Sequence, residues 1–571
     1  MFRILNAILI LLIGAMAALG GHPKIARDLE GANPESTVDV IVQYKQAPTA
    51  AHHQKIIRMG GRQKRDLSVI MSGHYSLTAK SIAELANDPD VVAISPDRKV
   101  GATAFSNTKD YSWMSLSGLT GMGQSLSYDG RGIGVVVIDS GVDNLTDLQG
   151  SNGSRIVYRQ NFVVNEDLQG DAYGHGDHVA GIIAGNGAKS MGTTPLGTQY
   201  QFNYEARGLA PGANIVDFRV LDRNGQGTDS AVIAAIGQAI ALKNTYNIRI
   251  MNLSLGRAVA QSYLNDPLCQ AVERAWKAGI VVVVSAGNEG RNNSAKTNGY
   301  GTIASPGNDP YVITVGAMNT KGTLSRGDDV MTSYSSKGPT AIDHIAKPDL
   351  VAPGNQIWSL RGGGTTLGNM SSQNGVPISA YTNSTTNTVF DYYQLSGTSM
   401  AAPMVSGTVA LMLQKTPALT PDQVKARLMK SASKSLPFSS VAKDLVSGVS
   451  YTSYYDMFTV GAGYLDTFGA LNNTDLAPAG ASAKSPAITF ANGNASIVSA
   501  TGVVWGSGVV WGSGVVWGSG VVWGSNLVGS TGVVWGSSVT SGFGVVWGSG
   551  VVWGSGVNTV ESTGVIFNGE N

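Results

Sequence analysis

Four separated segments of this chain carry side chains that together could cleave an unreactive amide bond. That reaction needs a nucleophile, a base that takes its proton, a carboxylate that orients the base, and donors for the developing oxyanion. The segments are VVVIDSGVD, GHGDHVAGIIAG, VVVVSAGNEG and LSGTSMAAPMVSG. They predict an acyl-transfer site made of Asp139, His175, Asn288 and Ser399.

The position of each residue suggests its role. Asp139 ends a Val- and Ile-rich run, where a buried carboxylate can fix the tautomer of His175. Asn288 has a side-chain amide that can donate to an oxyanion. Ser399 opens an Ala- and Gly-rich helix whose N-terminal dipole favours negative charge, and Pro403 is predicted to lie in its first turn. Singly, such residues are more often caps, turns or structural groups; their joint occurrence predicts a catalytic triad.

In their order along the chain, these segments resemble the subtilisin family of serine proteases. The matching blocks are VIDSGVD, HGDHVAG, NLSLG, SAGNEG, KPDLVAPG and GTSMAAPMVSG, which span nearly the whole central region. The order Asp, His, Ser is that of subtilisin and differs from the orders of chymotrypsin-like and α/β-hydrolase enzymes. The resemblance implies a serine endopeptidase that acts on proteins or peptides and needs no cofactor for catalysis.

The resemblance also implies where a substrate binds. The block NLSLG would present a strand edge on which an extended peptide pairs through its backbone. Small residues would wall a pocket for the side chain before the scissile bond, which favours broad specificity for large apolar side chains. The residues assigned to substrate binding are Ser254, Leu255, Gly256, Ala286, Gly287 and, at the pocket floor, Ala304.

One position departs from the family pattern. Subtilases usually carry Thr inside the block HGTHVAG, where this chain has Asp177. A carboxylate two residues from His175 could raise the basicity of nearby histidine if it points inward. The stretch also comes close to the H-x-H-x-D-H pattern of metallohydrolases, but Tyr173 stands where the first histidine is needed. A catalytic metal is therefore disfavoured.

Structural calcium is an expectation that the resemblance raises without giving a site. Many subtilases bind calcium, and Asp147 matches a family ligand position. The loop that follows the His175 helix, at about 186–207, is greatly lengthened here. The other ligands can therefore not be carried across.

Alternating strand and helix patterns predict the fold of the central region, residues 108–473. Runs of Val and Ile bounded by Gly, as in GIGVVVIDSG and GIVVVVSAGN, are typical of parallel strands buried on both faces. Helical stretches such as TDSAVIAAIGQAIALKN separate them. The pattern predicts an α/β domain with a doubly wound, mostly parallel sheet, in which functional residues gather at the carboxyl ends of strands. The resemblance implies that this domain is subtilisin-like.

Two segments precede this domain. Residues 1–20 have an early Arg, an apolar run and then small residues, which predicts a secretory signal peptide and a secreted protein; a membrane anchor is the alternative. Residues 21–107 predict a small α/β sandwich of ferredoxin-like order, with two of its strands in LSVIMSGHYSLTA. Their ending, LANDPDVVAISPDRKV, resembles the inhibitory propeptides of subtilisin-type enzymes. The resemblance implies self-cleavage near residues 100–108; an unrelated binding module is the alternative.

The chain ends in a repeat. Residues 474–500, rich in Ala, Ser, Pro and Gly, are predicted to be a linker, and residues 501–571 contain VVWGS copies whose Trp residues are six or twelve positions apart. An extended chain would place all of these Trp on one face. Three interpretations stay open: a stacked β-type repeat, a surface for attachment or self-association that would retain the protein at the cell surface, and an incompletely ordered tail.

Composition narrows the remaining function classes. The 39 Lys and Arg nearly cancel the 38 Asp and Glu, so no charged field is available to attract nucleic acid. Cys269 is the only cysteine, which excludes an internal disulfide and predicts a buried small apolar group. The alternative of another class is an adhesive or scaffold protein with a vestigial protease fold. It is disfavoured because all four catalytic parts are intact.

Overall fold

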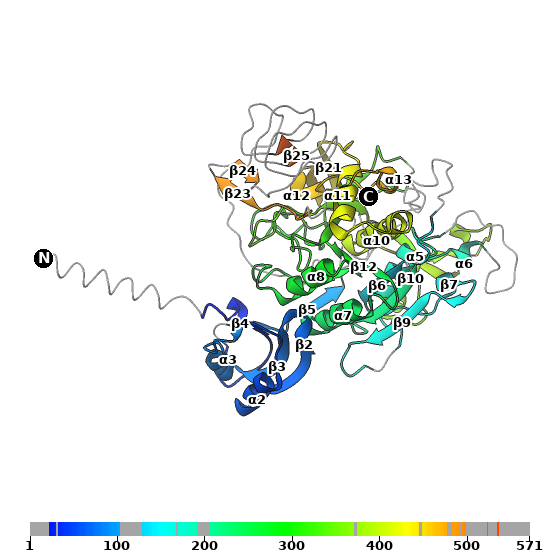
Figure 1. The fold of residues 1–571 in the computed structure, drawn as a ribbon. Coiled ribbons are helices and arrows are strands. Elements are labelled where there is room, and N and C mark those ends of the chain that lie inside the picture. The colour runs from blue at the N-terminus through cyan, green and yellow to red at the C-terminus, as the bar shows by residue number, and fades with distance from the viewer. Residues whose placement is uncertain are drawn as a thin grey trace.

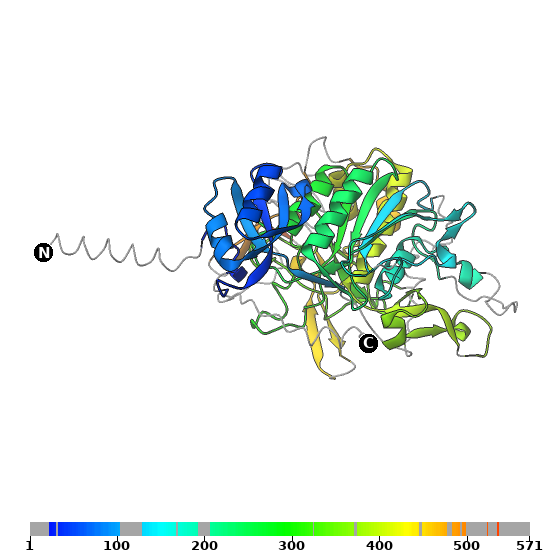
Figure 2. The same ribbon diagram turned by 90° about the horizontal axis from the view of Figure 1, so that it is seen from below.

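The protein is described by a computed structural model. It covers residues 22–29, 32–102, 128–166, 169–191, 206–323, 325–370, 374–386, 388–444, 448–476, 482–491, 494–497, 522–523 and 534–535. The predicted signal peptide, the start of the predicted catalytic domain and most of the repeat region lie outside the described residues. Within them, a small N-terminal unit lies against a larger central domain (Figures 1 and 2).

The N-terminal unit is a four-stranded antiparallel sheet with two helices. Its strand order, β2-β3-β1-β4, is the ferredoxin-like order. Side chains such as Val40, Ile56 and Leu77 give it an apolar core of its own. The elements are β1 (Thr37–Tyr44), α2 (Ala50–Arg58), β2 (Arg62–Leu67), β3 (Ser72–Thr78), α3 (Ala79–Leu85) and β4 (Val91–Pro96).

One strand of this unit lies earlier in the chain than the sequence predicts. LSVIMSGHYSLTA contains only one strand, β3, because Ser68–Ile70 form a 3-10 helix, and the other strand is β2. β2 lies at the edge of the sheet and most of its side chains are exposed. Polar residues are typical of edge strands, and they hide the alternation by which an inner strand is recognised.

The central domain is built on an eight-stranded sheet with the order β16-β15-β14-β12-β6-β10-β9, and β17 also pairs with β15. All of these pairs are parallel except β15 with β16, and every residue of β6 and β14 is buried. The strands are β6 (Gly134–Asp139), β9 (Ile156–Asn161), β10 (Asn214–Arg219), β12 (Ile248–Leu253), β14 (Val281–Ser285), β15 (Ile313–Asn319), β16 (Val330–Met331) and β17 (Leu350–Pro353).

Helices cover both faces of this sheet, as the sequence predicts for a doubly wound α/β domain (Figure 1). On one face, α5 (His175–Ala184) packs against α10 (Thr398–Lys415), which crosses β12, β14, β15 and β17. On the other face, α7 (Asp229–Leu242) packs against α8 (Pro267–Lys277). No helix in the described part of the chain combines the length and apolarity needed to cross a bilayer.

Smaller elements surround this core. A three-stranded sheet, in the order β18-β20-β19, lies beside α5. Two antiparallel hairpins, β7 with β8 and β21 with β22, lie further out. These and the remaining elements are β7 (Gln149–Gly150), β8 (Gly153–Ser154), α6 (Ala188–Met191), β18 (Ile357–Leu360), α9 (Thr366–Met370), β19 (Gly375–Pro377), β20 (Val389–Leu395), α11 (Pro421–Ser431), β21 (Ser439–Lys443), β22 (Ser450–Tyr454), α12 (Met457–Val460) and α13 (Thr467–Asn472).

The N-terminal unit docks on α7 and α8 (Figure 2). Its Leu67 and Ile70 belong to the apolar core of the central domain, and its Arg65 donates to the carbonyl of Ser230 at 3.2 Å. The chain then leaves the unit as β5 (Lys99–Ala102) and enters the central domain. There it becomes the middle strand of an antiparallel sheet, between β11 (Gln226–Thr228) and β13 (Leu255–Gly256).

Described residues of the segment predicted to be a linker pack on the central domain. Ala483 and Ser485 are buried, and the Ser485 hydroxyl donates to Asp349 at 2.5 Å. β23 (Ile488–Ala491) and β24 (Asn494–Ile497) then form a hairpin. Polar and small residues occur in linkers and also in segments that pack on a domain surface, so composition alone did not reveal this packing.

Candidate active site

The structure brings His175 and Asp139 into direct contact. The distance between His175 Nδ1 and Asp139 Oδ1 is 2.7 Å, and both side chains are fully buried. Asp139 is the last residue of β6 and His175 is the first residue of α5. Gly176 allows this approach, because a side-chain carbon there would lie 2.0 Å from the carbonyl oxygen of Gly141.

Ser399 lies at the start of α10, facing the strand β13. Its Oγ donates to the carbonyl of Ser254 at 3.0 Å. Among the described residues, Nε2 of His175 has no hydrogen-bond partner. In a serine protease this nitrogen takes the proton of the nucleophile, so the base has its second nitrogen available for that step.

Asn288, the predicted oxyanion donor, is bonded to the residue that precedes Ser399. Its Oδ1 accepts hydrogen bonds from the backbone N–H and the hydroxyl of Thr398, both at 3.0 Å. Thr398 directly precedes Ser399, and its hydroxyl in turn accepts the N–H of Gly287 at 3.1 Å. These bonds fix which end of the Asn288 amide is the oxygen, so its NH₂ group faces the other way, as an oxyanion donor must.

Pro403 does not lie in the first turn of its helix, contrary to the sequence prediction. It is the sixth residue of α10, inside the helix. Having no N–H, it cannot bond to the carbonyl four residues earlier, which is that of Ser399. The hydroxyl of Ser254 donates to this carbonyl instead, at 2.8 Å. The start of α10 is thereby joined to the edge strand next to the nucleophile.

The residues predicted for substrate binding lie together around this point. β13 contains Leu255 and Gly256, which pair with Ala102 and Gly101 of β5. The floor residue Ala304 donates its N–H to the carbonyl of Ala286 at 2.9 Å. A side-chain carbon added at Gly256 or at Gly287 would lie 3.0 Å or 3.2 Å from the Ala304 methyl group. The small residues therefore leave the space that larger ones would fill.

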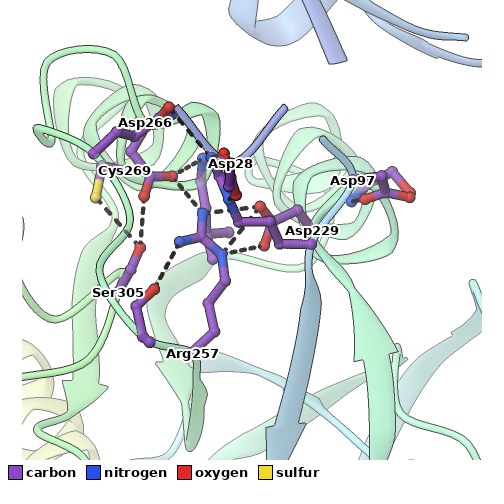
Figure 3. Close-up of polar contacts among 12 residues, drawn as sticks. Asp28, Asp97, Asp229, Arg257, Asp266, Cys269 and Ser305 are labelled. Atoms are coloured by element: carbon purple, nitrogen blue, oxygen red, sulfur yellow. Dashed lines mark hydrogen bonds and ion pairs between the residues drawn. The ribbon is translucent and has the colours of Figure 1, made fainter. Parts of the chain in front are cut away.

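A buried ion-pair network joins the two strands on either side of β5 (Figure 3). Arg257 follows β13 directly, and its guanidinium contacts Asp229, the first residue of α7, at 2.8 Å. It also contacts Asp266, the N-cap of α8, at 2.7 Å. Asp266 accepts the hydroxyl of Ser305 at 3.0 Å, and Ser305 is the neighbour of the pocket-floor residue. One cation thus joins the residues that directly follow β11 and β13.

Burial and charge shape this network. Burial raises the pKa of Asp229 to about 6, although Arg257 opposes the shift. The pKa of Arg257 is raised by its two carboxylate partners in spite of its burial. Cys269 lies at its margin, fully buried, with Sγ 3.3 Å from Asn308 Oδ1, and burial raises the pKa of its thiol. It is a packing residue, as predicted.

Carboxylates surround the start of α5. Asp171 accepts the N–H groups of Tyr173 at 3.0 Å, Gly174 at 2.7 Å and Asp177 at 2.8 Å, so it caps the helix that carries the base. Burial raises the pKa of Asp171 to about 6, and the same hydrogen bonds oppose the shift. The sequence left open whether the Asp177 side chain points inward. It does point inward, and it is fully buried.

The metallohydrolase alternative finds no support at the block that suggested it. His178 Nε2 is 2.9 Å from the carbonyl oxygen of Ile357, which makes it a donor, and burial lowers the pKa of His178 to about 3. No three His, Cys, Asp or Glu side chains of the described residues are placed to hold a metal ion.

Asp147, the residue that matches a family calcium-ligand position, is satisfied by protein donors. Its Oδ1 accepts the N–H of Lys189 at 2.8 Å and its Oδ2 accepts the hydroxyl of Tyr392 at 2.6 Å. The Arg155 guanidinium donates to the backbone carbonyl of Asp147 at 2.8 Å, and also to the carbonyls of Ala184 and Ala213. Because an arginine takes the carbonyl groups and a tyrosine takes the carboxylate, these residues do not fit a calcium ion.

Comparison with known proteins identifies the family of this chain. Residues 130–501 match the Subtilase family. The chain is 38% identical over 317 residues to Serine protease AprX of Bacillus subtilis (strain 168), across 55% of this chain and 63% of AprX, a little under two thirds of its length. It is 31% identical over 398 residues to Subtilisin E of the same organism, across 69% of this chain and 84% of Subtilisin E.

A solved structure has the same fold. The crystal structure of fervidolysin from Fervidobacterium pennivorans, described as a keratinolytic enzyme related to subtilisin, matches with a TM-score of 0.56 and 23% identity, over 81% of this chain and 64% of that one. The chain therefore belongs to the Subtilase family, the subtilisin-like serine endopeptidases.

Several residues of this site were not found from the sequence. Asp229 is the first residue of α7, which is a signal for a cap, whereas Asp171 lies four residues before α5. Arg257 directly follows the block NLSLG. The pairing of Arg257 with Asp229 joins two separate segments, and nothing in a single sequence reveals such a pairing. Tyr392 lies in a segment without any motif.

Proposed function

We propose that this chain is an exported endopeptidase that is made as an inactive precursor and cleaves itself. The observation that carries the proposal is the course of β5, a segment of the chain's own N-terminal part that lies between β11 and β13. β13 directly follows Ser254, whose carbonyl accepts the Ser399 hydroxyl. A bound strand in an enzyme's cleft is the expected pose of a substrate or of a product-like inhibitor. The N-terminal unit is then the inhibitory propeptide, and cleavage occurs within a few residues after Ala102.

The proposed reaction is acyl transfer through the triad. Ser399 Oγ attacks the peptide carbonyl carbon while His175 Nε2 takes its proton, and Asp139 stabilises the imidazolium that forms. Asn288 donates to the oxyanion. His175 then gives the proton to the leaving amine, the C–N bond breaks, and an acyl-enzyme remains on Ser399. Water, activated by the same imidazole, hydrolyses this ester and restores the serine.

Broad specificity with a preference for large apolar side chains is part of the proposal. The backbone pairing on β13 reads no side chain, and Gly256, Gly287 and Ala304 bring no charge to the predicted pocket. A cleavage profile on a peptide library tests this. Dominant cleavage after Lys or Arg would exclude the preference.

Fluorophosphonate labelling tests the enzyme itself. The mature protein should be labelled at Ser399, and Ser399→Ala should abolish labelling and lower kcat on the order of a millionfold. This variant should also accumulate with its N-terminal unit still covalently attached. Labelling that persists in the variant excludes the triad, and normal trimming of the purified variant excludes self-cleavage.

A second role, attachment or self-association through the VVWGS repeats, is proposed for the C-terminal region. It is supported by one contact: Val522–Trp523 pairs in parallel with Val534–Trp535, so two repeats twelve residues apart lie in register. Deletion of 501–557 should leave peptidase activity on a soluble peptide unchanged and abolish surface association. Loss of activity on deletion would show that the repeats belong to the catalytic unit.

A further inference from the structure

Asp177, which departs from the subtilase pattern, lies where two catalytic segments meet. It is in the first turn of α5, two residues after His175, and it is fully buried. Its Oδ1 accepts the backbone N–H of Asp143 at 2.6 Å. Asp143 belongs to the loop that follows β6 and begins at Asp139. The Asp177 side chain thus connects the helix that carries the base to the loop that follows its carboxylate.

The second oxygen of Asp177 has no hydrogen-bond partner among the described residues. It is directed to the same place as a carboxylate oxygen of Asp143. A side-chain carbon on Gly362 would lie 2.2 Å from Asp177 Oδ2 and 2.8 Å from Asp143 Oδ2, so only glycine fits between them. Asp143 is partly exposed, and its other oxygen accepts the N–H of Asp171 at 3.1 Å. A buried carboxyl and a partly exposed one therefore lie side by side.

The surroundings of Asp177 are mainly acidic. Burial is the largest cause of a strongly raised pKa of Asp177, and three neighbouring carboxylates raise it further. The cation in this group is already paired, since Arg159 Nε lies 3.6 Å from Asp217 Oδ2. The groups facing Asp177 are Asp143 from the loop after β6, Asp171 from the loop before α5, Asp217 from β10, Arg159 from β9 and Tyr393 from β20.

We propose that Asp177 is a positioning residue that works as a neutral carboxylic acid. Its O–H donates to Asp143 Oδ2 while its other oxygen accepts the Asp143 N–H. This double contact holds the loop after Asp139 against α5 and keeps Asp139 in line with His175. Loss of the Asp177 proton sets the alkaline limit of activity. The inference rests on the proposed peptidase function for its activity readout.

That proton loss breaks the double contact. The new charge on Asp177 repels the Asp143 carboxylate and loosens the loop after β6 from α5. Asp139, which directly precedes this loop, is then held less firmly against His175, so kcat/KM falls as the pH rises.

The test compares Asp177→Asn with Asp177→Ala in the full chain, with rates divided by the fraction of Ser399 that fluorophosphonate labels. Asparagine keeps one acceptor and one donor but cannot ionise. It should keep kcat/KM near neutral pH within about threefold and move the alkaline midpoint up by about one pH unit. Alanine, which removes both contacts, should lower kcat/KM about tenfold or more at every pH.

Two results would overturn the proposal. One is an alkaline limb that is the same in the Asn variant and the parent. The other is an Asn variant as weak as the Ala variant at every pH, which would mean that the ionised carboxylate is the working form.

A second measurement does not depend on activity. In an inactive Ser399→Ala background, the free energy of unfolding of the parent should fall as the pH rises from about 4, because the unfolded Asp177 ionises first. The fall should end near the pH at which Asp177 ionises in the folded protein. The Asp177→Asn variant should lack the part of the fall that comes from Asp177. Equal pH dependence in the two proteins overturns the inference about Asp177. Absent labelling of the parent would overturn the proposed function alone.

Discussion

The helices α5 and α10, which carry the proposed base and the proposed nucleophile, begin in opposite electrostatic surroundings. Carboxylates hold the start of α5. Asp171 accepts two N–H groups just before the helix and that of Asp177 in its first turn, and Asp177 joins the helix to the loop after β6. The first turn of α10 is held by neutral groups. Asn288 binds Thr398, and the hydroxyl of Ser254 binds the Ser399 carbonyl.

The difference matches what each end must do. At α5, carboxylates interact with the positive end of the helix dipole and hold the first turn in place. Because carboxylates can ionise, the structure at this end of the helix also depends on pH. At α10, the first turn is bonded to the Asn288 amide and the Ser254 hydroxyl, which are neutral, so the positive end stays available to a transient oxyanion. We therefore expect substitutions around Ser399 to have the same effect at every pH. Substitutions around His175 should have effects that depend on pH.

The largest expected effect is on the nucleophile side. Asn288→Ala should lower kcat on the order of 10²- to 10³-fold with little change in KM, because its donor acts on charge that exists only in the transition state. The loss should be the same at every pH at which the parent is active. Thr398→Val is the matched control, since it removes a hydroxyl that binds the Asn288 oxygen and the Gly287 N–H but leaves the Asn288 amide in place, and its loss should stay below about tenfold. An effect on KM alone would contradict the oxyanion role.

The next effect concerns the carbonyl that Pro403 leaves without an N–H. Ser254→Ala should lower the free energy of unfolding by about 1–3 kcal/mol, because the buried Ser399 carbonyl loses its donor. Pro403→Ala supplies an N–H within the helix, so the double variant should be less destabilised than Ser254→Ala alone. Denaturant unfolding in the Ser399→Ala background measures this. Additive effects of the two substitutions would show that the two donors do not replace each other.

On the base side, Asp171→Asn should change how stability depends on pH. Burial raises the pKa of Asp171 from 3.8 to about 6 in the folded protein, so its contribution is present at low pH and is lost as the pH rises through about 6. The Asn variant lacks this loss, so its unfolding free energy relative to the parent should rise between those two pH values. Denaturant unfolding at several pH values measures it, and parallel curves would exclude the effect.

The smallest effect is expected at Asp147, whose carboxylate accepts the hydroxyl of Tyr392. Tyr392→Phe should lower the free energy of unfolding by about 1 kcal/mol, because Asp147 loses a buried donor. Tyr381→Phe is the matched control: its hydroxyl has no hydrogen-bond partner in the described part of the chain, and its ring packs against Tyr392 at 5.3 Å. A chelator should leave the stability contributed by Asp147 unchanged. Destabilisation of both variants by the same amount would remove the role assigned to the hydroxyl.

The parts of the site that the sequence predicted are those whose chemistry needs a fixed residue in a fixed local setting. Asp139 and His175 stand at the end of a buried strand and the start of a helix, and the structure places them there in contact. The doubly wound sheet was predictable for a similar reason, because strands buried on both faces must be apolar throughout.

The parts that the sequence did not predict depend on partners distant in the chain. Local rules predict Pro403 in the first turn of its helix, but the helix starts five residues earlier, at Thr398. The donor that replaces the missing N–H comes from Ser254, in a distant segment. Arg257 gives no local sign that it spans two strand ends. Edge strands such as β2 carry no apolar alternation, so their positions depend on the sheet that they join.

The position of β5 has a further consequence if the N-terminal unit is the proposed propeptide. As long as the chain is continuous, the strand between β11 and β13 is tethered, and its local concentration is on the order of millimolar whatever the total protein concentration. A free peptide at micromolar concentration competes poorly with such a tether. Once the tether is cut, the occupancy of the site by β5 depends on the concentration of the released unit. The active fraction would then rise with dilution and with any protease that removes this unit.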